Sequence, residues 1–269
     1  MRISKPYQAQ LDTLLNKKRI GLVCDFDGTL SPIVSHPDQA QITPKNKKYL
    51  EFLQHHLALL AFISGRGAGD LHKRAGISNA VYVGNHGLER WEKGVIRVHP
   101  EAQPYRQAMD STLQAIRAHH VPGMFIEDKG VTLSVHYRQT DNPALVGERL
   151  YAPMAQIAEE NKIALFRGRM VFEFRPPIQA DKGTAFRSLV EEYQLDGAVY
   201  LGDDTTDIAA LNMARMLRKQ GLCYALGGGV NSPGTPESVK LASDFLVETV
   251  SGVEELLAYW VKFIKASST

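Results

Sequence analysis

The sequence has few of the features that mark secreted or membrane-spanning proteins. Its 269 residues contain two cysteines, Cys24 and Cys223, which are too few for a disulfide framework. Each lies in an apolar stretch, so we expect two buried thiols in a reducing compartment. The longest apolar run, Leu57–Ile63, is far shorter than a bilayer span. The first eleven residues are polar and lack the apolar segment of a secretory signal. We therefore expect a cytoplasmic protein.

The sequence also lacks an excess of charge of either sign. Its 31 basic and 29 acidic residues give a formal net charge of +2. Such a balance gives no reason to expect a nucleic acid or an anionic membrane as a partner. No internal repeat or low-complexity segment is present. Hydrophobic residues make up 44% of the chain, which is enough for one large domain or two small ones with real cores.

Short apolar runs alternate with helical stretches, a pattern typical of an α/β protein with a parallel sheet. Thr43–Leu53 is predicted to be a helix, with Thr43 as its N-cap and Pro44 in its first position. The apolar runs are nearly continuous, as expected of strands buried on both faces. The predicted strands are Ile20–Asp25, Ala58–Ile63, Val81–Val83 and Ala198–Leu201.

The stretch 100–177 has a different character. It follows a β-α-β-β-α-β-β-like pattern with antiparallel hairpins, and prolines flank it at both ends. Helices are predicted at 105–119 and 145–161, and strands at 124–129, 132–137, 163–166 and 170–174. We therefore predict a Rossmann-like parallel-sheet core formed by residues 1–99 and 178–269, with an α+β cap domain inserted at 100–177.

The strongest chemical signal follows the first predicted strand. Asp25 and Asp27 lie two residues apart and are followed by Gly28, which permits a tight turn. Ligands of open α/β sheets bind beyond the carboxyl ends of the strands, so these carboxylates would lie at the crevice. One carboxylate could attack phosphorus while the other transfers a proton to or from the leaving group. Oxygens of this turn would also suit Mg²⁺. The alternative is an ordinary turn with solvated acids.

Three further segments end strands or begin helices in the same way. Ser64, in the sequence Ser64-Gly65-Arg66, offers a hydroxyl group and backbone N–H groups for a phosphate oxygen. Lys182 opens a helical stretch, where its ammonium group could neutralise the nucleophile and the phosphate. Each of these two signals is weak when taken alone, because turns and solvated lysines are common.

The third segment is Gly202–Asp207, in which Asp203, Asp204 and Asp207 are crowded after a buried strand. Crowded carboxylates repel one another unless a cation or a lysine compensates them. This crowding favours metal binding over a solvated loop.

In this order, the four segments resemble the motifs of the haloacid dehalogenase-like phosphatases. Asp25 and Asp27 match the first motif, Ser64 the second and Lys182 the third, while Asp203 and Asp207 match the fourth. The resemblance implies a Mg²⁺ held by Asp25, the backbone carbonyl of Asp27, and Asp203, with Asp204 either a ligand or a neighbour of the ligands. It also implies phosphoryl transfer to Asp25 and then hydrolysis by water, with Asp27 as general acid and then general base.

Further motifs resemble those of the trehalose-6-phosphate phosphatases. They are Gly84–Glu89, Glu127–Gly130, His136–Arg138 and Phe172–Pro176, and with the core motifs they span Leu22 to Leu257. The resemblance implies that Glu127, Lys129 and Glu173 grip the sugar hydroxyls, and charged side chains suit that task because they make charge-assisted hydrogen bonds. The full predicted set of substrate-binding residues is Arg66, Asn85, His86, Glu127, Lys129, His136, Arg138 and Glu173.

Alternatives remain open within and beyond this family. A related phosphatase for sucrose phosphate, mannosylglycerate phosphate or glucosylglycerol phosphate would share the core residues and differ in the cap. A catalytically dead regulatory module would normally have lost one of the charged core residues, and all of them are present here. We expect a monomer that acts on a small sugar phosphate, with a synthase as an optional partner. Gly227-Gly228-Gly229 matches no nucleotide-binding loop, and we interpret it as a flexible turn.

Overall fold

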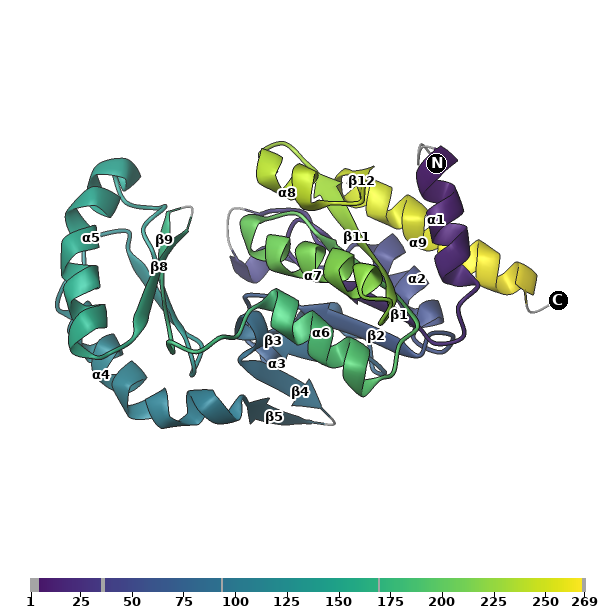
Figure 1. Ribbon diagram of the computed structural model, residues 1–269. Helices are drawn as coiled ribbons and strands as arrows, with labels where there is room; N and C mark the ends of the chain where they lie inside the picture. The colour runs from purple at the N-terminus through teal and green to yellow at the C-terminus, as the bar shows by residue number, and fades with distance from the viewer. Residues whose placement is uncertain (1–4, 35–36, 93, 169, 268–269) are drawn as a thin grey trace. The chain divides into compact units, whose positions relative to one another are not determined.

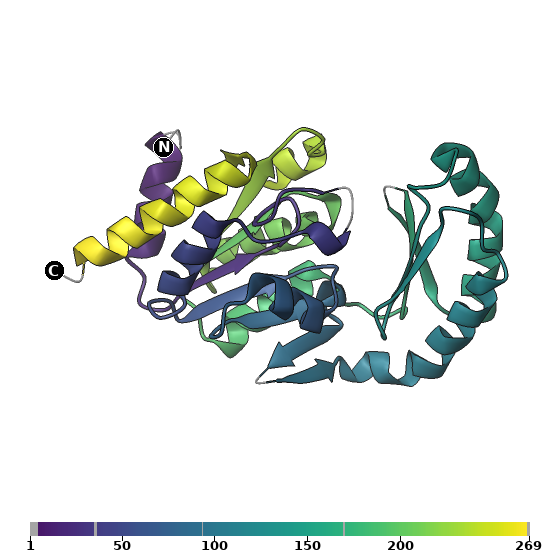
Figure 2. The ribbon, with the colours of Figure 1, turned by 180° about the vertical axis from the view of Figure 1, so that it is seen from behind.

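The computed structural model describes residues 5–34, 37–92, 94–168 and 170–267. The expectation about the polar N-terminal segment concerns residues that lie partly outside these ranges. Contacts within the chain divide it into two units, which Figures 1 and 2 show from opposite sides. One unit, called the core here, comprises residues 1–97 and 180–269, and the other, called the cap, comprises residues 98–179.

The core is built on an eight-stranded sheet with the order β12-β11-β10-β1-β2-β3-β4-β5. Neighbouring strands from β12 to β3 run parallel, and β4 pairs antiparallel with β3. The predicted α/β class with a mainly parallel sheet is therefore confirmed. In chain order, the strands are β1 (Ile20–Cys24), β2 (Leu59–Ile63), β3 (Val81–Gly84), β4 (Glu89–Glu92), β5 (Val95–Val98), β10 (Gly197–Gly202), β11 (Tyr224–Asn231) and β12 (Phe245–Glu248).

Helices cover both faces of this sheet, so its central strands are buried on both sides. One apolar cluster joins the sheet to α1, α2, α3 and α9, and a second joins it to α6, α7 and α8. Figure 1 shows α6 and α7 in front of the sheet, and Figure 2 shows α2 and α9 there. The bounds are α1 (Lys5–Leu15), α2 (Pro44–Leu53), α3 (Ala68–Ala75), α6 (Lys182–Glu192), α7 (Ile208–Lys219), α8 (Glu237–Ala242) and α9 (Thr249–Ser267).

Local sequence rules explain where the helices begin and which side they bury. Helix α2 starts as predicted, because the Thr43 hydroxyl accepts a hydrogen bond from the Asn46 N–H at 3.2 Å and Pro44 follows it. Leu256, Leu257 and Trp260 of α9 recur at helical spacing, and all three are fully buried. Such a stripe is the usual signature of a helix that packs on a sheet.

One prediction about the core is wrong. Gly227-Gly228-Gly229 is not a flexible turn but lies in the middle of β11, which pairs with β10 and β12. Glycine occupies this strand because there is no room for a side chain. A Cβ atom at Gly228 would lie 2.5 Å from the ring of Phe245 and 2.6 Å from Leu201. The glycines let the neighbouring side chains close over this strand, and the ladder hydrogen bonds keep it extended.

The cap has its own four-stranded antiparallel sheet, in the order β6-β7-β9-β8. An apolar cluster of Met109, Ile116, Leu150, Met154 and neighbouring residues packs its two helices against the strands. The order along the cap is helix-strand-strand, repeated once, so among the described residues no strand of the cap sheet precedes the first helix, contrary to the predicted pattern. The elements are α4 (Arg106–Arg117), β6 (Phe125–Asp128), β7 (Leu133–His136), α5 (Pro143–Glu160), β8 (Ala164–Gly168) and β9 (Val171–Arg175).

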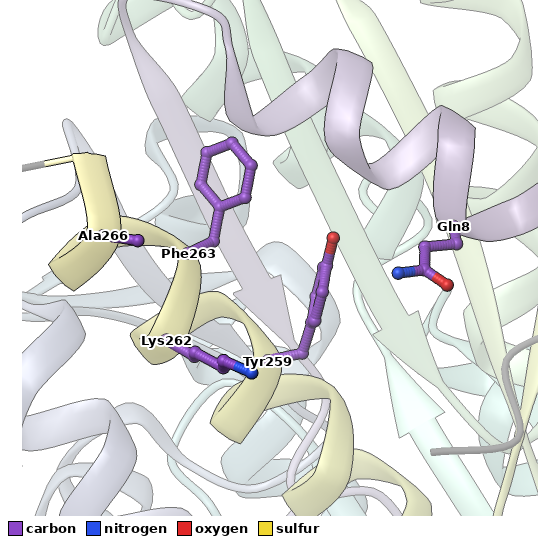
Figure 3. Close-up of a pocket in the computed structure, with 5 residues that line it drawn as sticks. All are labelled: Gln8, Tyr259, Lys262, Phe263 and Ala266. Atoms are coloured by element: carbon purple, nitrogen blue, oxygen red, sulfur yellow. The ribbon is translucent and has the colours of Figure 1, made fainter.

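A surface cavity of about 480 Å³ lies where α1 meets α9, and Figure 3 shows its lining. The lining residues are Gln8, Tyr259, Lys262, Phe263 and Ala266. None of them carries a carboxylate or belongs to the predicted site, so this cavity is not the candidate active site. Within the described ranges, no helix is both long enough and apolar enough to cross a membrane.

Candidate active site

The predicted core residues lie at the carboxyl ends of neighbouring parallel strands. Asp25 follows β1, Ser64 follows β2 and Asp203 follows β10, and β1 lies between the other two strands. The Asp25 N–H donates to the Leu201 carbonyl at 2.8 Å, which carries the pairing of β1 and β10 one residue past the strand. The strand order therefore brings residues far apart in sequence to one edge of the sheet.

A buried lysine joins two of the aspartates. The Lys182 ammonium group donates to Asp25 Oδ1 and to Asp207 Oδ1, at 2.7 Å in each case. All three side chains are at most 6% exposed. Lys182 is held there because it is the first residue of α6, whose N-cap Asp181 forms a reciprocal capping box with Thr184. Sequence reasoning selected these residues, and the structure brings them together.

Asp207 is an acceptor whose two oxygens are already engaged. Oδ1 also accepts the Tyr200 hydroxyl at 2.5 Å, and Oδ2 accepts the backbone N–H groups of Asp203 and Asp204 at 3.1 and 3.0 Å. With Lys182, this makes four donors. Asp207 therefore orients Lys182 and the loop after β10. Sequence reasoning missed Tyr200, although a hydroxyl group inside an otherwise apolar buried strand is a signal that could have identified it.

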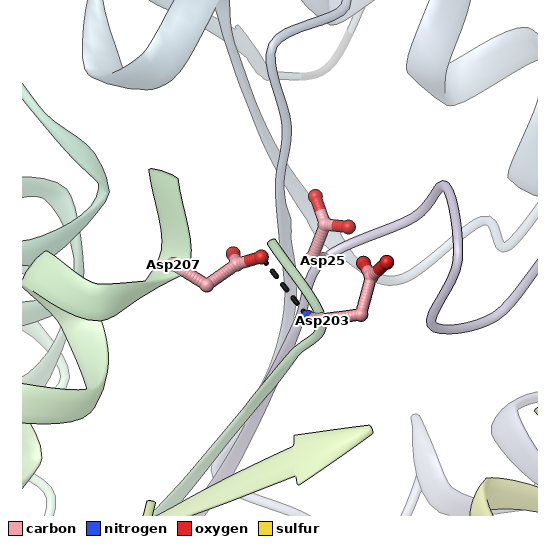
Figure 4. A group of neighbouring side chains, drawn as sticks. All are labelled: Asp25, Asp203 and Asp207. Carbon is pink, nitrogen blue, oxygen red and sulfur yellow. Dashed lines mark hydrogen bonds between the residues drawn. The ribbon is translucent and has the colours of Figure 1, made fainter. Parts of the chain in front are cut away.

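Asp25, Asp203 and Asp207 form an acidic cluster, which Figure 4 shows with the hydrogen bond from the Asp203 N–H to Asp207. Each offers an oxygen within 4.8 Å of the other two, and all three are buried. With one lysine among three carboxylates, the ionised groups leave a net charge of −2. Because Asp207 is satisfied by its donors, Asp25 and Asp203 are the carboxylates best placed to take a divalent cation.

Gly28 is required for this arrangement. Its φ of +82° is in the left-handed region, and a Cβ atom there would lie 2.1 Å from Asp203 Oδ2. Only glycine combines that backbone conformation with so close an approach. The Thr29 hydroxyl lies 3.4 Å from Asp203 Oδ1, so the turn after β1 also positions the acid that follows β10. Asp204 is exposed, its backbone N–H donates to Asp207 Oδ2, and its carboxylate caps the short turn that ends at Asp207.

Burial shifts the pKa values of these groups. It raises the pKa of Asp25 well above its usual value, because the charges of Asp207 and Asp203 add to the effect and only Lys182 opposes it. Burial and the neighbouring Asp207 raise the pKa of Asp203 to about 7. Burial alone would lower the pKa of Lys182, but Asp207 and Asp25 outweigh it and raise that pKa above its usual value. The protein alone therefore leaves the two carboxylates short of positive charge.

Asp27 points to a different partner. Arg66 holds it with two parallel hydrogen bonds, Nε to Oδ2 at 2.6 Å and Nη2 to Oδ1 at 2.8 Å. Asp27 is 39% exposed at its side chain, unlike the buried Asp25. Sequence reasoning predicted both residues for the site but not this pairing.

Ser64, Asn85 and His86 lie around the Arg66 turn. Ser64 is buried, and its backbone N–H and C=O bind Val83 and His86 at 3.0 and 2.9 Å. Asn85 and His86 follow β3 with φ values of 49° and 58°, an uncommon conformation for residues other than glycine. Strained residues held by their surroundings cluster at functional sites. The structure therefore places these three predicted residues beside one another in the core.

A second group of predicted residues lies in the cap. His136 Nε2 lies 3.1 Å from Glu127 Oε2, and the Lys129 ammonium group lies 3.6 Å from the same oxygen. Ser134 pairs with Glu127 on one side and with Glu173 on the other, so the two glutamates share one row across three strands. Arg175 donates a short hydrogen bond to Glu173. Arg138 is exposed beyond the end of β7, outside this row.

The sequence of this chain is similar to the sequences of one known protein family. The sequence profile of the trehalose-phosphatase family matches residues 23–223. The chain is 32% identical over 217 residues to the "Probable trehalose-phosphate phosphatase 4" of Oryza sativa subsp. japonica. That match covers 76% of this chain and 57% of the rice protein, so the chain spans little more than half of its relative.

Solved structures show the same fold. The C-terminal domain of the C. albicans trehalose-6-phosphate phosphatase has a TM-score of 0.77 and 23% identity, over 95% of this chain and 97% of that one. A haloacid dehalogenase-like hydrolase from Bacteroides thetaiotaomicron has a TM-score of 0.63 and 17% identity, over 90% and 99%. The fold is therefore that of the haloacid dehalogenase-like proteins. With the profile match over most of its length, the chain belongs to the trehalose-phosphatase family.

Proposed function

We propose that the protein is a Mg²⁺-dependent phosphatase that hydrolyses trehalose 6-phosphate to trehalose and phosphate. The observation that carries this proposal is the buried group of Asp25, Lys182 and Asp207 with Asp203 beside it. A buried carboxylate next to a fixed ammonium group, at the sheet edge where ligands bind, is suited to attack on phosphorus.

The proposed reaction has two halves, and Asp27 serves both. In the first, Asp25 attacks phosphorus, the bond from phosphorus to the sugar oxygen breaks, and Asp27 gives its proton to that oxygen. In the second, a water molecule attacks the aspartyl-phosphate and gives a proton to Asp27, while the bond from phosphorus to Asp25 breaks. Phosphate leaves, and Asp25 and Asp27 return to their starting states. Lys182 stays between Asp25 and Asp207 and offsets the negative charge of the reacting groups.

The donor set fits a magnesium ion. Asp25 and Asp203, with the backbone carbonyl of Asp27, would be the protein ligands, and water would complete the shell. When bound, the ion would supply two positive charges against the carboxylates and the substrate phosphate. The net charge of −2 that the acidic cluster carries when all its groups are ionised, and the raised pKa of Asp203, support this assignment.

The cap residues would bind the sugar. Glu127, Lys129, His136 and Glu173 place charged and polar groups on one sheet, which suits a ligand with many hydroxyl groups. We assign Ser64 and the backbone around it to the phosphate, and Asn85 and His86 to substrate contacts in the core. Family membership favours trehalose 6-phosphate over other sugar phosphates.

A panel of sugar phosphates tests the proposal. Phosphate release would be measured with trehalose 6-phosphate, sucrose phosphate, mannosylglycerate phosphate and glucosylglycerol phosphate, with and without EDTA. We expect the highest kcat/KM for trehalose 6-phosphate, complete loss of activity in EDTA and recovery with Mg²⁺. Ca²⁺ should not restore activity, because its larger and looser shell would misplace the phosphate. A better substrate elsewhere in the panel would reject the sugar assignment, and full activity after chelation would reject the metal.

A further inference from the structure

The Arg66 guanidinium group contacts two carboxylates from separate elements. Its Nε and Nη2 bind the two oxygens of Asp27, while its Nη1 donates to Asp70 Oδ2 at 3.1 Å. The same Asp70 oxygen accepts Arg74 Nε at 2.7 Å. Asp27, Arg66, Asp70 and Arg74 therefore form a row of alternating negative and positive groups from the loop after β1 to helix α3. Asp27 is the member of this row that lies at the candidate site.

The guanidinium group is fixed from several directions. The Arg66 side chain is 11% exposed, and its Cζ lies 5.8 Å from the centre of the Phe26 ring, which is fully buried. Its backbone carbonyl accepts the Asn85 N–H at 2.7 Å. Two residues later, the Ala68 N–H at the start of α3 donates to the buried Glu89 carboxylate at 3.0 Å. Such an arginine has little freedom to move, so it can impose its orientation on Asp27.

We propose that Arg66 is a positioning residue that fixes the Asp27 carboxylate so that it can take a proton from the attacking water, and not a substrate ligand as its place in the sequence suggests. The inference rests on the proposed function. All three guanidinium nitrogens donate to protein carboxylates, and the two-point contact fixes the plane of Asp27 as well as its place. Asp27 is 39% exposed, so without this contact its side chain would rotate in solvent.

Orientation matters because proton transfer contributes only when donor and acceptor are aligned. Positioned acid–base groups contribute about 10²–10⁴-fold to rate. Arg66→Ala should therefore lower kcat for the sugar phosphate by about 10–100-fold with KM nearly unchanged. Arg66→Lys keeps the charge but loses the planar fork, so it should recover only a small part of the loss. Guanidine added to Arg66→Ala should restore activity, because it can supply the missing fork.

A substrate with a good leaving group separates this role from a general structural one. In p-nitrophenyl phosphate, the bond from phosphorus to the aryl oxygen breaks without a proton, so attack by Asp25 should proceed at nearly the wild-type rate. Hydrolysis of the aspartyl-phosphate still needs Asp27 to take a proton from water, and this step should slow. Arg66→Ala should therefore release a rapid burst of p-nitrophenol, about one per enzyme, before a slow steady state.

Arg90→Ala is the matched control. Arg90 lies on β4, forms a similar ion pair with Glu192 at 2.6 Å and donates to the Tyr193 hydroxyl, and neither partner is assigned to the site. This variant should show no burst and an unchanged kcat. If circular dichroism shows that Arg66→Ala does not fold, the burst of p-nitrophenol would be measured with Arg66→Lys instead.

Three results would overturn the inference. A rise in KM with unchanged kcat would make Arg66 a substrate ligand, and a fully active Arg66→Lys would show that charge alone suffices. A loss of activity towards p-nitrophenyl phosphate without a burst would point to damage to Asp25 rather than Asp27. The burst test uses p-nitrophenyl phosphate and does not depend on which sugar is the substrate. It therefore remains valid if the sugar assignment in the proposed function is wrong. A wild-type protein that hydrolyses no phosphate monoester would reject both.

Discussion

At the scale of single residues, the candidate site depends most on the environment of one carboxyl group. Asp25 is buried, bound to Lys182 at 2.7 Å and adjacent to two further acids. Asp25→Asn keeps the shape of the side chain and removes its ability to attack phosphorus. We expect turnover to fall by several orders of magnitude, as is common when a covalent nucleophile is removed, with the circular dichroism spectrum unchanged. A variant that kept more than a few per cent of wild-type activity would contradict the assignment of the nucleophile.

The two cysteines give a second prediction at this scale. Cys24 and Cys223 are free thiols, 0% and 3% exposed. Burial raises the pKa of Cys223 to about 12 and that of Cys24 further. At pH 8 both should therefore remain thiols rather than reactive thiolates. Ellman's reagent should modify neither cysteine in the native protein and both in guanidinium chloride. Rapid modification of the native protein would show that the burial is wrong.

Sequence patterns predicted the acidic residues more readily than their partners. Asp25, Asp27, Asp203 and Asp207 stand out because each follows an apolar run by a few positions, which is visible within a short window. The contacts from Arg66 to Asp27 and from Tyr200 to Lys182 through Asp207 join different loops and strands. Such pairings depend on strand order and side-chain direction, which no short window contains.

At the scale of secondary structure, the best-predicted elements are those with a continuous apolar run or a clear cap. Strands β1, β2 and β10 and helix α2 lie within one or two residues of their predicted bounds. Strand β11 was missed because glycine gives no hydrophobic signal, and its identity as a strand depends on the residues packed above it. Strand β5 also gives no signal of a buried apolar face, since Val95 and Ile96 are exposed.

The packing around β11 leads to a stability prediction. Gly228→Ala adds one methyl group next to Phe245 and Leu201, and Gly228→Val adds more. We expect the free energy of unfolding to fall by about 1–3 kcal/mol for alanine and further for valine, because the neighbours must shift. Urea unfolding followed by fluorescence would measure this. As a control, Leu241→Ala at a side chain that is 73% exposed should change it by less than about 0.5 kcal/mol. Equal stability of Gly228→Val and wild type would refute the packing argument.

At the scale of the whole molecule, the division into core and cap predicts that the core carries the phosphoryl chemistry and the cap binds the sugar. If the cap binds the sugar, Glu127→Ala, Lys129→Ala and Glu173→Ala should each lower kcat/KM for trehalose 6-phosphate by about 10–100-fold, since each would remove a charged hydrogen bond worth about 1.5–3 kcal/mol. Slow hydrolysis of p-nitrophenyl phosphate, which has no sugar, should hardly change. Arg167→Ala is a suitable control, because Arg167 pairs with the exposed Glu148 on the cap surface. A parallel fall for both substrates would mean that these cap residues are structural.

The pairing of β1 with β10 has a consequence for how the chain must fold. Ile20 lies opposite Gly197, so one edge of the first strand stays open until β10 (Gly197–Gly202) has been made. Pairings between such distant segments form slowly, because a long loop must close first. A fragment that stops at the cap would expose an unpaired edge of an apolar strand, which favours aggregation. During synthesis, the loop that carries Asp25 therefore cannot form its contact with Lys182 until residue 182 has emerged.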